Sequence, residues 1–184
     1  MPRFRIIALG DSITYGYPFG HRYSWVELLS QKLGEPICNA GSNGDTFRDL
    51  KNRIWIDAVD RNPEYVIVSG GANDFYQQSN PTLMKEFFKR IIEILLESNI
   101  KPILALQPPL AHKELEKKFR EFRKFVKKEA KKNKFPLLNF YDPFLNSKKT
   151  KIHSDLLEDG LHPSVAGYQL MAEVAYPVIQ KILK

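Results

Sequence analysis

Four short polar clusters in this 184-residue chain contain residue types that can do chemistry. Ser12, Gly41 and Asn73 each follow an apolar run, and Asp159 stands three residues before His162. An acidic residue at that spacing on a turn can accept the imidazole Nδ1 proton, which leaves Nε2 free to act as a base. A serine hydroxyl is a weak nucleophile until such a base takes its proton. The sequence therefore offers the parts of a serine, histidine and aspartate relay.

Five short apolar runs alternate with longer helical patterns, which is typical of a parallel α/β sheet. We predict strands at 4–9, 36–40, 65–69, 102–106 and 136–141. We predict helices from 24 to 34, from about 47 to 59, after residue 80, over the basic segment 113–134, and from about 164 to 183. In the third helix the apolar spacing predicts a buried face made of Leu83, Phe87, Ile91, Ile94 and Leu95.

The loops after the first three predicted strands carry the polar residues. Because the carboxyl ends of parallel strands lie at one edge of a sheet, and ligands bind there, we expect these loops to open together. The turn at 158–163 lies just before the last predicted helix and can fold over the same edge. Ser12, Asp159 and His162 can then converge.

With these motifs the chain resembles the SGNH, or GDSL, hydrolase family. The matching blocks follow the family order over nearly the whole length: Gly10-Asp11-Ser12, the glycine Gly41, Gly71-x-Asn73-Asp74, and Asp159-x-x-His162. Ile13 stands where many members have leucine. The resemblance implies one domain over 1–184, a three-layer α/β/α sandwich with a five-stranded parallel sheet of the flavodoxin-like type.

The resemblance also implies roles for these residues. Ser12 would be the nucleophile, His162 its general base and then acid, and Asp159 the carboxylate that orients the imidazole. The oxyanion donors would be the backbone N–H groups of Ser12 and Gly41 and the side-chain amide of Asn73. The implied substrate is a small-molecule carboxylic ester, with thioesters and acetylated carbohydrates as further candidates. Because the chain has no large lid insertion, we favour small, accessible esters.

The positive charge is concentrated in one segment. The chain has a formal net charge of +7, and residues 113–134 hold 11 of its 28 Lys and Arg residues but only 4 of its 21 Asp and Glu residues. Leu115, Phe119, Phe122 and Val126 recur at helical spacing there, so we interpret the segment as a docked helix with its lysines in solvent. Binding of an anion or nucleic acid through this helix, without catalysis, stays open as an alternative function.

A second alternative is a phosphoaspartyl enzyme that uses Asp11, although the further aspartate expected two residues on is Ile13. We find no Cys/His cluster with metal-ligand spacing and no Rossmann or P-loop motif, so we expect no cofactor and no metal. The single cysteine, Cys38, is interpreted as a core residue and permits no internal disulfide. The N-terminus lacks a signal-peptide core and the apolar runs are too short for a membrane span, so we expect a cytoplasmic protein.

Other histidines and aromatic residues are weaker candidates for the site. His153, with an acidic residue two positions on, is the rival base, and its spacing does not by itself reach a glycine-rich loop. His21, His112 and the aromatic residues of loop 15–25 are candidates for the rim of a pocket. Asp74 is interpreted as a turn or capping residue.

Overall fold

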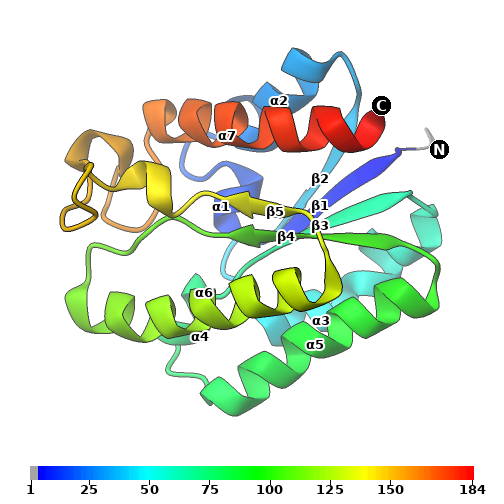
Figure 1. Ribbon diagram of the computed structural model, residues 1–184, viewed down its shortest axis with the longest axis horizontal. Coiled ribbons are helices and arrows are strands. Elements are labelled where there is room, and N and C mark those ends of the chain that lie inside the picture. The colour runs from blue at the N-terminus through cyan, green and yellow to red at the C-terminus, as the bar shows by residue number, and fades with distance from the viewer. Residues whose placement is uncertain (1–3) are drawn as a thin grey trace.

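The computed structural model describes residues 4–184 and contains a five-stranded parallel sheet with helices on both faces (Figure 1). The strands are β1 (Ile6–Gly10), β2 (Ile37–Gly41), β3 (Tyr65–Ser69), β4 (Lys101–Leu106) and β5 (Leu137–Asn139), in the order β2-β1-β3-β4-β5. This confirms the predicted fold class and the approximate position of every strand. The first three residues, which bear on the signal-peptide expectation, lie outside the described part of the chain.

Five long helices lie where the sequence predicts them: α2 (Trp25–Leu33), α3 (Phe47–Asp57), α5 (Pro81–Glu97), α6 (Lys113–Asn133) and α7 (Val165–Leu183). The short helices α1 (Ser12–Tyr15) and α4 (Ala72–Tyr76) were not predicted. Neither were the 3₁₀ turns η1 (His21–Tyr23), η2 (Val59–Arg61), η3 (Asp142–Phe144) and η4 (Ser154–Leu156). Elements of three to five residues are too short to show a hydrophobic period.

The sheet separates two hydrophobic cores. Helices α2 and α7 cover one face, and α3, α5 and α6 cover the other (Figure 1). Along β1, Ile6 and Ala8 point to the first core, whereas Ile7 and Leu9 point to the second. Because both faces of the central strands are buried, β1 and β3 are almost entirely apolar, whereas the outer strands β2 and β5 also contain the polar residues Asn39 and Asn139.

The predicted buried face of α5 is wrong at its first turn. Leu83 is 47% exposed and Phe87 is only partly buried, while Met84 and Phe88 enter the core. The face that packs against the sheet and α6 contains residues 84, 88, 91 and 95, at spacings of three and four. Since apolar residues also occur one position earlier, the local pattern fits either face, and the contacts with neighbouring helices select one.

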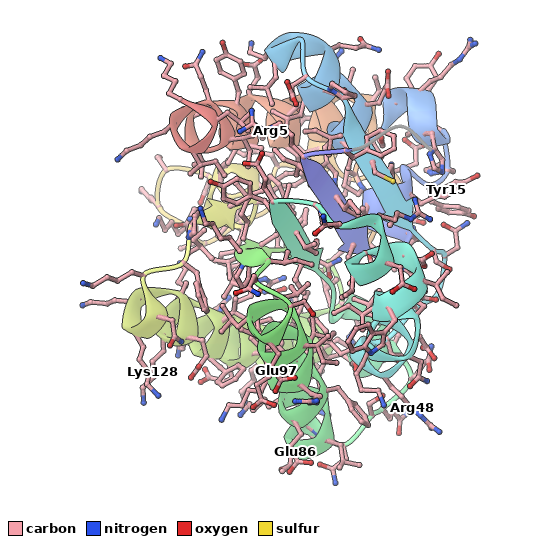
Figure 2. All side chains as sticks on the ribbon, turned by 90° about the vertical axis from the view of Figure 1, so that its right-hand side faces the viewer. Arg5, Tyr15, Arg48, Glu86, Glu97 and Lys128 are labelled. Atoms are coloured by element: carbon pink, nitrogen blue, oxygen red, sulfur yellow. The ribbon has the colours of Figure 1, made fainter. Side chains whose placement is uncertain are left out.

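The helix α6 has the predicted apolar face, because Phe119, Phe122 and Val126 are buried. Its lysines are exposed, and Lys128 points away from the body of the protein in Figure 2. The basic segment was nevertheless interpreted too simply, because Arg123 is buried in the protein interior.

Strand β2 is at the edge of the sheet, and Cys38 on it is only partly buried. Its Sγ accepts a hydrogen bond of 3.2 Å from Nη1 of Arg61. Cys38 is therefore less buried than the core position predicted for it, because an edge strand has a neighbouring strand on one side only.

The direction in which successive strands are added to the sheet reverses at β1, because β2 lies on one side of β1 and β3 lies on the other. In an open α/β sheet such a switch point leaves a crevice at the carboxyl ends of the strands. Gly10 is level with both Gly41 of β2 and Ser69 of β3, so the three strands end together. The loops that follow them therefore start side by side.

Candidate active site

Ser12 is the first residue of α1, directly beyond the end of β1. The side chain of Asp11 caps this helix, and its Oδ1 accepts a hydrogen bond of 3.0 Å from the backbone N–H of Ile13. The helix ends after one turn at Gly16, whose φ of 101° is in the left-handed region that favours glycine. This short, capped turn fixes the direction in which the Ser12 hydroxyl points.

Ser12, His162 and Asp159 converge as predicted. Ser12 Oγ lies 2.9 Å from His162 Nε2, and His162 Nδ1 lies 2.7 Å from Asp159 Oδ2. An ionised carboxylate can only accept, so the Nδ1–H donates to Asp159 and the lone pair of Nε2 faces the hydroxyl. This is the arrangement that takes a proton from a serine as it attacks a carbonyl carbon.

The turn that carries His162 is built around Asp159. Oδ1 of Asp159 accepts the backbone N–H groups of Leu161 at 3.0 Å and His162 at 2.8 Å. Burial acts to raise the pKa of Asp159, but the hydrogen bonds from His162 and the two backbone amides outweigh it and hold the pKa below its usual value. Asp159 is therefore ionised near neutral pH and favours a proton on Nδ1.

The other histidines do not join this relay. His153 is exposed, and its backbone N–H donates to the carbonyl of Phe144. His112 caps α6, since its Nδ1 accepts the backbone N–H of Leu115. His21 packs edge-to-face on Tyr15.

Two aromatic residues lie near the relay. The ring of Tyr17 is 4.6 Å from the ring of His162, between the ring centroids. Burial raises the pKa of the Tyr76 phenol, and the negative charge of Asp159 raises this pKa further. Both tyrosines are exposed in part, so they form an aromatic rim around the site. By contrast, Trp25 from the predicted aromatic loop is fully buried in the core.

Two of the three predicted oxyanion donors are available. The backbone N–H of Ser12 has no acceptor among residues 4–184. Asn73 is on α4, and its Nδ2 donates one hydrogen to the carbonyl of Asp45 at 2.9 Å. A side-chain amide carries two hydrogens, so Asn73 keeps one for a ligand.

The third predicted donor, Gly41, is engaged elsewhere. Its backbone N–H donates to Oδ1 of Asn39 at 3.0 Å, and a Cβ at this position would collide with the backbone of Tyr15. Glycine is thus needed there to let α1 pack on β2, and its role as an oxyanion donor stays a prediction. Gly44 in the same loop has a φ of 84° and open space around it. Its backbone N–H has no acceptor within the described residues.

Arg53, on α3, connects the loop after β2 to the end of β1, next to Ser12. It donates to the carbonyl of Gly10 at 2.8 Å and to Oδ2 of Asp45 at 2.6 Å. Since the carbonyl of Asp45 in turn accepts from Asn73, one arginine aligns three loops of the site. Arg53 was not predicted as a site residue because it lies mid-helix, 43 residues from Gly10 along the chain.

Gln107 makes the matching connection on the other side. Its Nε2 donates to Oδ2 of Asp11 at 2.7 Å, and its Oε1 accepts the backbone N–H of Ala72 at 3.1 Å. One side chain therefore sets the spacing between the loop of Ser12 and the helix of Asn73. Its place directly after β4 was the available signal, because the other site loops also follow strands.

The two remaining acids of the motifs are structural. Asp11 is fully buried, which raises its pKa to about 6 despite hydrogen bonds from Gln107 and Ile13. Both of its oxygens are occupied, so it presents no free nucleophile and the phosphoaspartyl alternative loses its key residue.

Burial raises the pKa of Asp74 to about 7, and its Oδ2 accepts the backbone N–H of Phe47 at the start of α3. Asp74 therefore has a structural role, but it bonds a helix 27 residues away along the chain instead of the local backbone predicted for a turn or capping residue.

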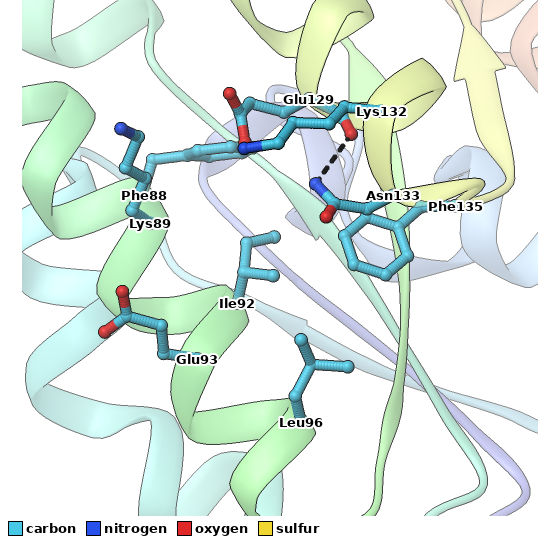
Figure 3. A pocket seen from close by; sticks show the side chains of 9 residues that line it. All are labelled: Phe88, Lys89, Ile92, Glu93, Leu96, Glu129, Lys132, Asn133 and Phe135. Carbon is cyan, nitrogen blue, oxygen red and sulfur yellow. Dashed lines mark hydrogen bonds between the residues drawn. The ribbon is translucent and has the colours of Figure 1, made fainter.

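A separate cavity of about 280 Å³ lies between α5 and α6 (Figure 3). It is lined by residues such as Phe88, Ile92 and Phe135, and it lies near the start of β5, whereas Ser12 follows the end of β1. This cavity is therefore not part of the site formed by Ser12, Asp159 and His162.

Residues 4–184 contain neither a group of metal-ligating side chains nor a helix that could span a membrane. No group of three or more His, Cys, Asp or Glu side chains there could hold a metal ion. None of the helices in this range has both the length and the apolar character needed to cross a membrane.

A model of the GDSL-like lipase/acylhydrolase family matches residues 8–170, which include Ser12, Asn73, Asp159 and His162. The chain belongs to this family. Membership confirms the resemblance inferred from the motifs and the prediction of an enzyme of the esterase and acylhydrolase class. The Ser12–His162 hydrogen bond is consistent with the serine and histidine chemistry of that class.

Two relatives and one solved structure show how similar this chain is to individual proteins. The lipoprotein YqeF of Bacillus subtilis is 30% identical over 118 residues, 57% of this chain, and the chain spans about half (49%) of that protein. An acetylxylan esterase of Geobacillus stearothermophilus is 27% identical over 160 residues, 80% of this chain and 73% of the esterase. The solved structure of a lipolytic G-D-S-L protein from Desulfitobacterium hafniense superposes with a TM-score of 0.86 at 30% identity, covering 94% of this chain and 98% of that one. The expected cytoplasmic location stays a prediction.

Proposed function

We propose that this GDSL family member hydrolyses small carboxylic esters through an acyl-enzyme on Ser12. The observation that carries the proposal is the unbroken relay from Ser12 Oγ to His162 Nε2 at 2.9 Å and from Nδ1 to Asp159 at 2.7 Å. His162 takes the hydroxyl proton as Oγ attacks the ester carbonyl, and returns it to the departing alcohol. Water, activated by the same imidazole, then releases the acid and restores Ser12.

The negative charge that forms on the carbonyl oxygen needs preorganised donors. The free backbone N–H of Ser12 and the second hydrogen of Asn73 Nδ2 support such a hole. The third donor is Gly41, if its amide leaves Asn39 when substrate binds, or the unengaged amide of Gly44.

The proposed substrates have a short acyl group, and acetylated carbohydrates are among them. The rim formed by Tyr17 and Tyr76 supports this choice, because partly exposed aromatic rings can pack against a sugar or an aryl group. The likeness to an acetylxylan esterase supports the acetyl group. A substrate panel with acyl chains of two to about sixteen carbons and sugar, aryl and thiol leaving groups tests this choice.

The mechanism is tested with Ser12→Ala, assayed on p-nitrophenyl acetate. Turnover should fall on the order of 10⁶-fold, as it does when a serine hydrolase loses its nucleophile. A fluorophosphonate should label the native protein without added Mg²⁺ and leave Ser12→Ala unlabelled. If Ser12→Ala keeps more than a few per cent of the activity, or native protein is not labelled, the proposal is wrong.

A further inference from the structure

A second cavity, of about 520 Å³, lies between the start of α6, the segment after β4 and the loop after η3. These segments are at the end of the molecule toward which the strands point (Figure 1). Apolar side chains line its interior, namely Pro109, Leu110, Leu145 and Ile152. Five cationic side chains also line it, namely Lys113, Lys117, Arg120, Lys149 and Lys151. Ser12, Asp159 and His162 are not among the lining residues.

The positive charge of this cavity is largely uncompensated. Its one acidic lining residue, Glu116, is held by Arg123 at 2.9 Å and by the backbone N–H of Leu110 at 2.8 Å. Lys149 lies 3.3 Å from Asp142. Lys113, Lys117 and Lys151 have no acidic partner among residues 4–184, so these three ammonium groups are free to meet a ligand.

We infer that this cavity binds a small phosphorylated compound with an apolar or aromatic portion. The apolar interior suits the body of the ligand, and the volume is within the range of about 300–1,000 Å³ that small-molecule sites occupy. A phosphate carries up to two negative charges and three acceptor oxygens, so it can meet several ammonium groups at once. A single carboxylate carries one charge and satisfies fewer of them.

The cavity adjoins the serine site but does not share its three relay residues. The backbone N–H of Ala111, in the cavity wall, donates to the carbonyl of Gly160 at 2.8 Å. A Cβ on Gly160 would stand only 2.9 Å from Cβ of Ala111, so the two segments are in close contact. This contact places one side of the cavity directly beside the turn that carries Asp159 and His162.

Isothermal titration of the native protein with three probes tests the site. Phenyl phosphate should bind at least about tenfold more tightly than phenol, which lacks the charge, because charge-assisted hydrogen bonds are strong. It should also bind more tightly than inorganic phosphate, which lacks the apolar body. Equal binding of phenyl phosphate and phenol, or of phenyl phosphate and phosphate, overturns the proposal, and so does no binding at millimolar concentration.

Two matched double variants locate the binding. Lys117→Gln/Lys151→Gln removes two unpaired cations from the cavity and should weaken phenyl phosphate binding about tenfold or more. Lys128→Gln/Lys131→Gln removes the same net charge from the exposed far end of α6 and should leave binding within about twofold. Ser12→Ala should bind phenyl phosphate as the native protein does. Equal losses in both double variants would indicate general charge attraction, and lost binding in Ser12→Ala would place the ligand in the crevice; either result refutes the site.

Discussion

The buried ion pair on α6 allows a quantitative prediction about stability. Arg123 is 3% exposed, and its guanidinium donates to Glu116 at 2.9 and 3.1 Å and to the carbonyls of Gln107 and Pro108. Burial lowers the pKa of Arg123 to about 10, against the opposing effect of Glu116, so the side chain stays charged at neutral pH. Arg123→Met removes the buried cation that faces the Glu116 carboxylate, which keeps only the backbone N–H of Leu110 at 2.8 Å and Arg120 at 4.0 Å. It also removes the side chain that donates to the carbonyls of Gln107 and Pro108.

Removing one partner of a buried pair typically destabilises a protein by about 3–5 kcal/mol. We expect Arg123→Met to lower the free energy of unfolding by that amount, measured by urea denaturation at pH 7. Glu116→Gln/Arg123→Met should lose less than Arg123→Met alone, because no uncompensated buried charge remains and the glutamine oxygen can still accept from Leu110. The comparison isolates the charge from the loss of packing.

The neighbouring residue on the same helix is the control. Lys124 pairs with Glu121 at 2.8 Å, but both side chains are about two-thirds exposed (65% and 67%). Lys124→Met should change the free energy of unfolding by less than about 1 kcal/mol, as exposed pairs do. A loss below about 1 kcal/mol for Arg123→Met, or an equal loss for Lys124→Met, would show that burial of the pair does not determine its contribution.

Three further predictions concern the site. In initial-rate assays, His162→Ala should remove nearly all ester hydrolysis, and His153→Ala should cause only a mild loss. Asp159→Asn should cause an intermediate loss, because the imidazole keeps its place but loses its carboxylate. Comparable losses at His153 and His162 would mean that the base is misassigned. Asn73→Ala should lower kcat about 10²- to 10³-fold with KM little changed, as loss of one oxyanion donor does; a raised KM at constant kcat would instead make Asn73 a ground-state binding residue. Burial raises the pKa of Asp74 to about 7, from 3.8, so the folded state holds a proton that the unfolded state has lost, and stability should fall as pH rises from about 4 to about 7. Asp74→Asn should flatten this dependence in urea unfolding between pH 5 and pH 8, and an unchanged slope would assign it to another group.

The sequence alone determined the features that depend on neighbours along the chain. Strand and helix positions followed from apolar periods, and the helix caps at Ser24 and Ser164 formed at the predicted boundaries. The Asp159 and His162 pair was also predictable, because residues three apart on a turn can bond directly. Its approach to Ser12, 150 residues away, was inferred because parallel strands bring their following loops to one edge.

The tertiary structure decided which side chains hold those loops in place. Gln107 reaches Asp11 across 96 residues and Arg53 reaches Gly10 across 43, and no local pattern marks either contact. The burial of Arg123 within a basic helix was likewise hidden, because a charged residue at helical spacing looks the same whether it faces solvent or a partner. Burial and pairing depend on the sum of contacts from elements distant in the chain, so only the assembled fold determines them.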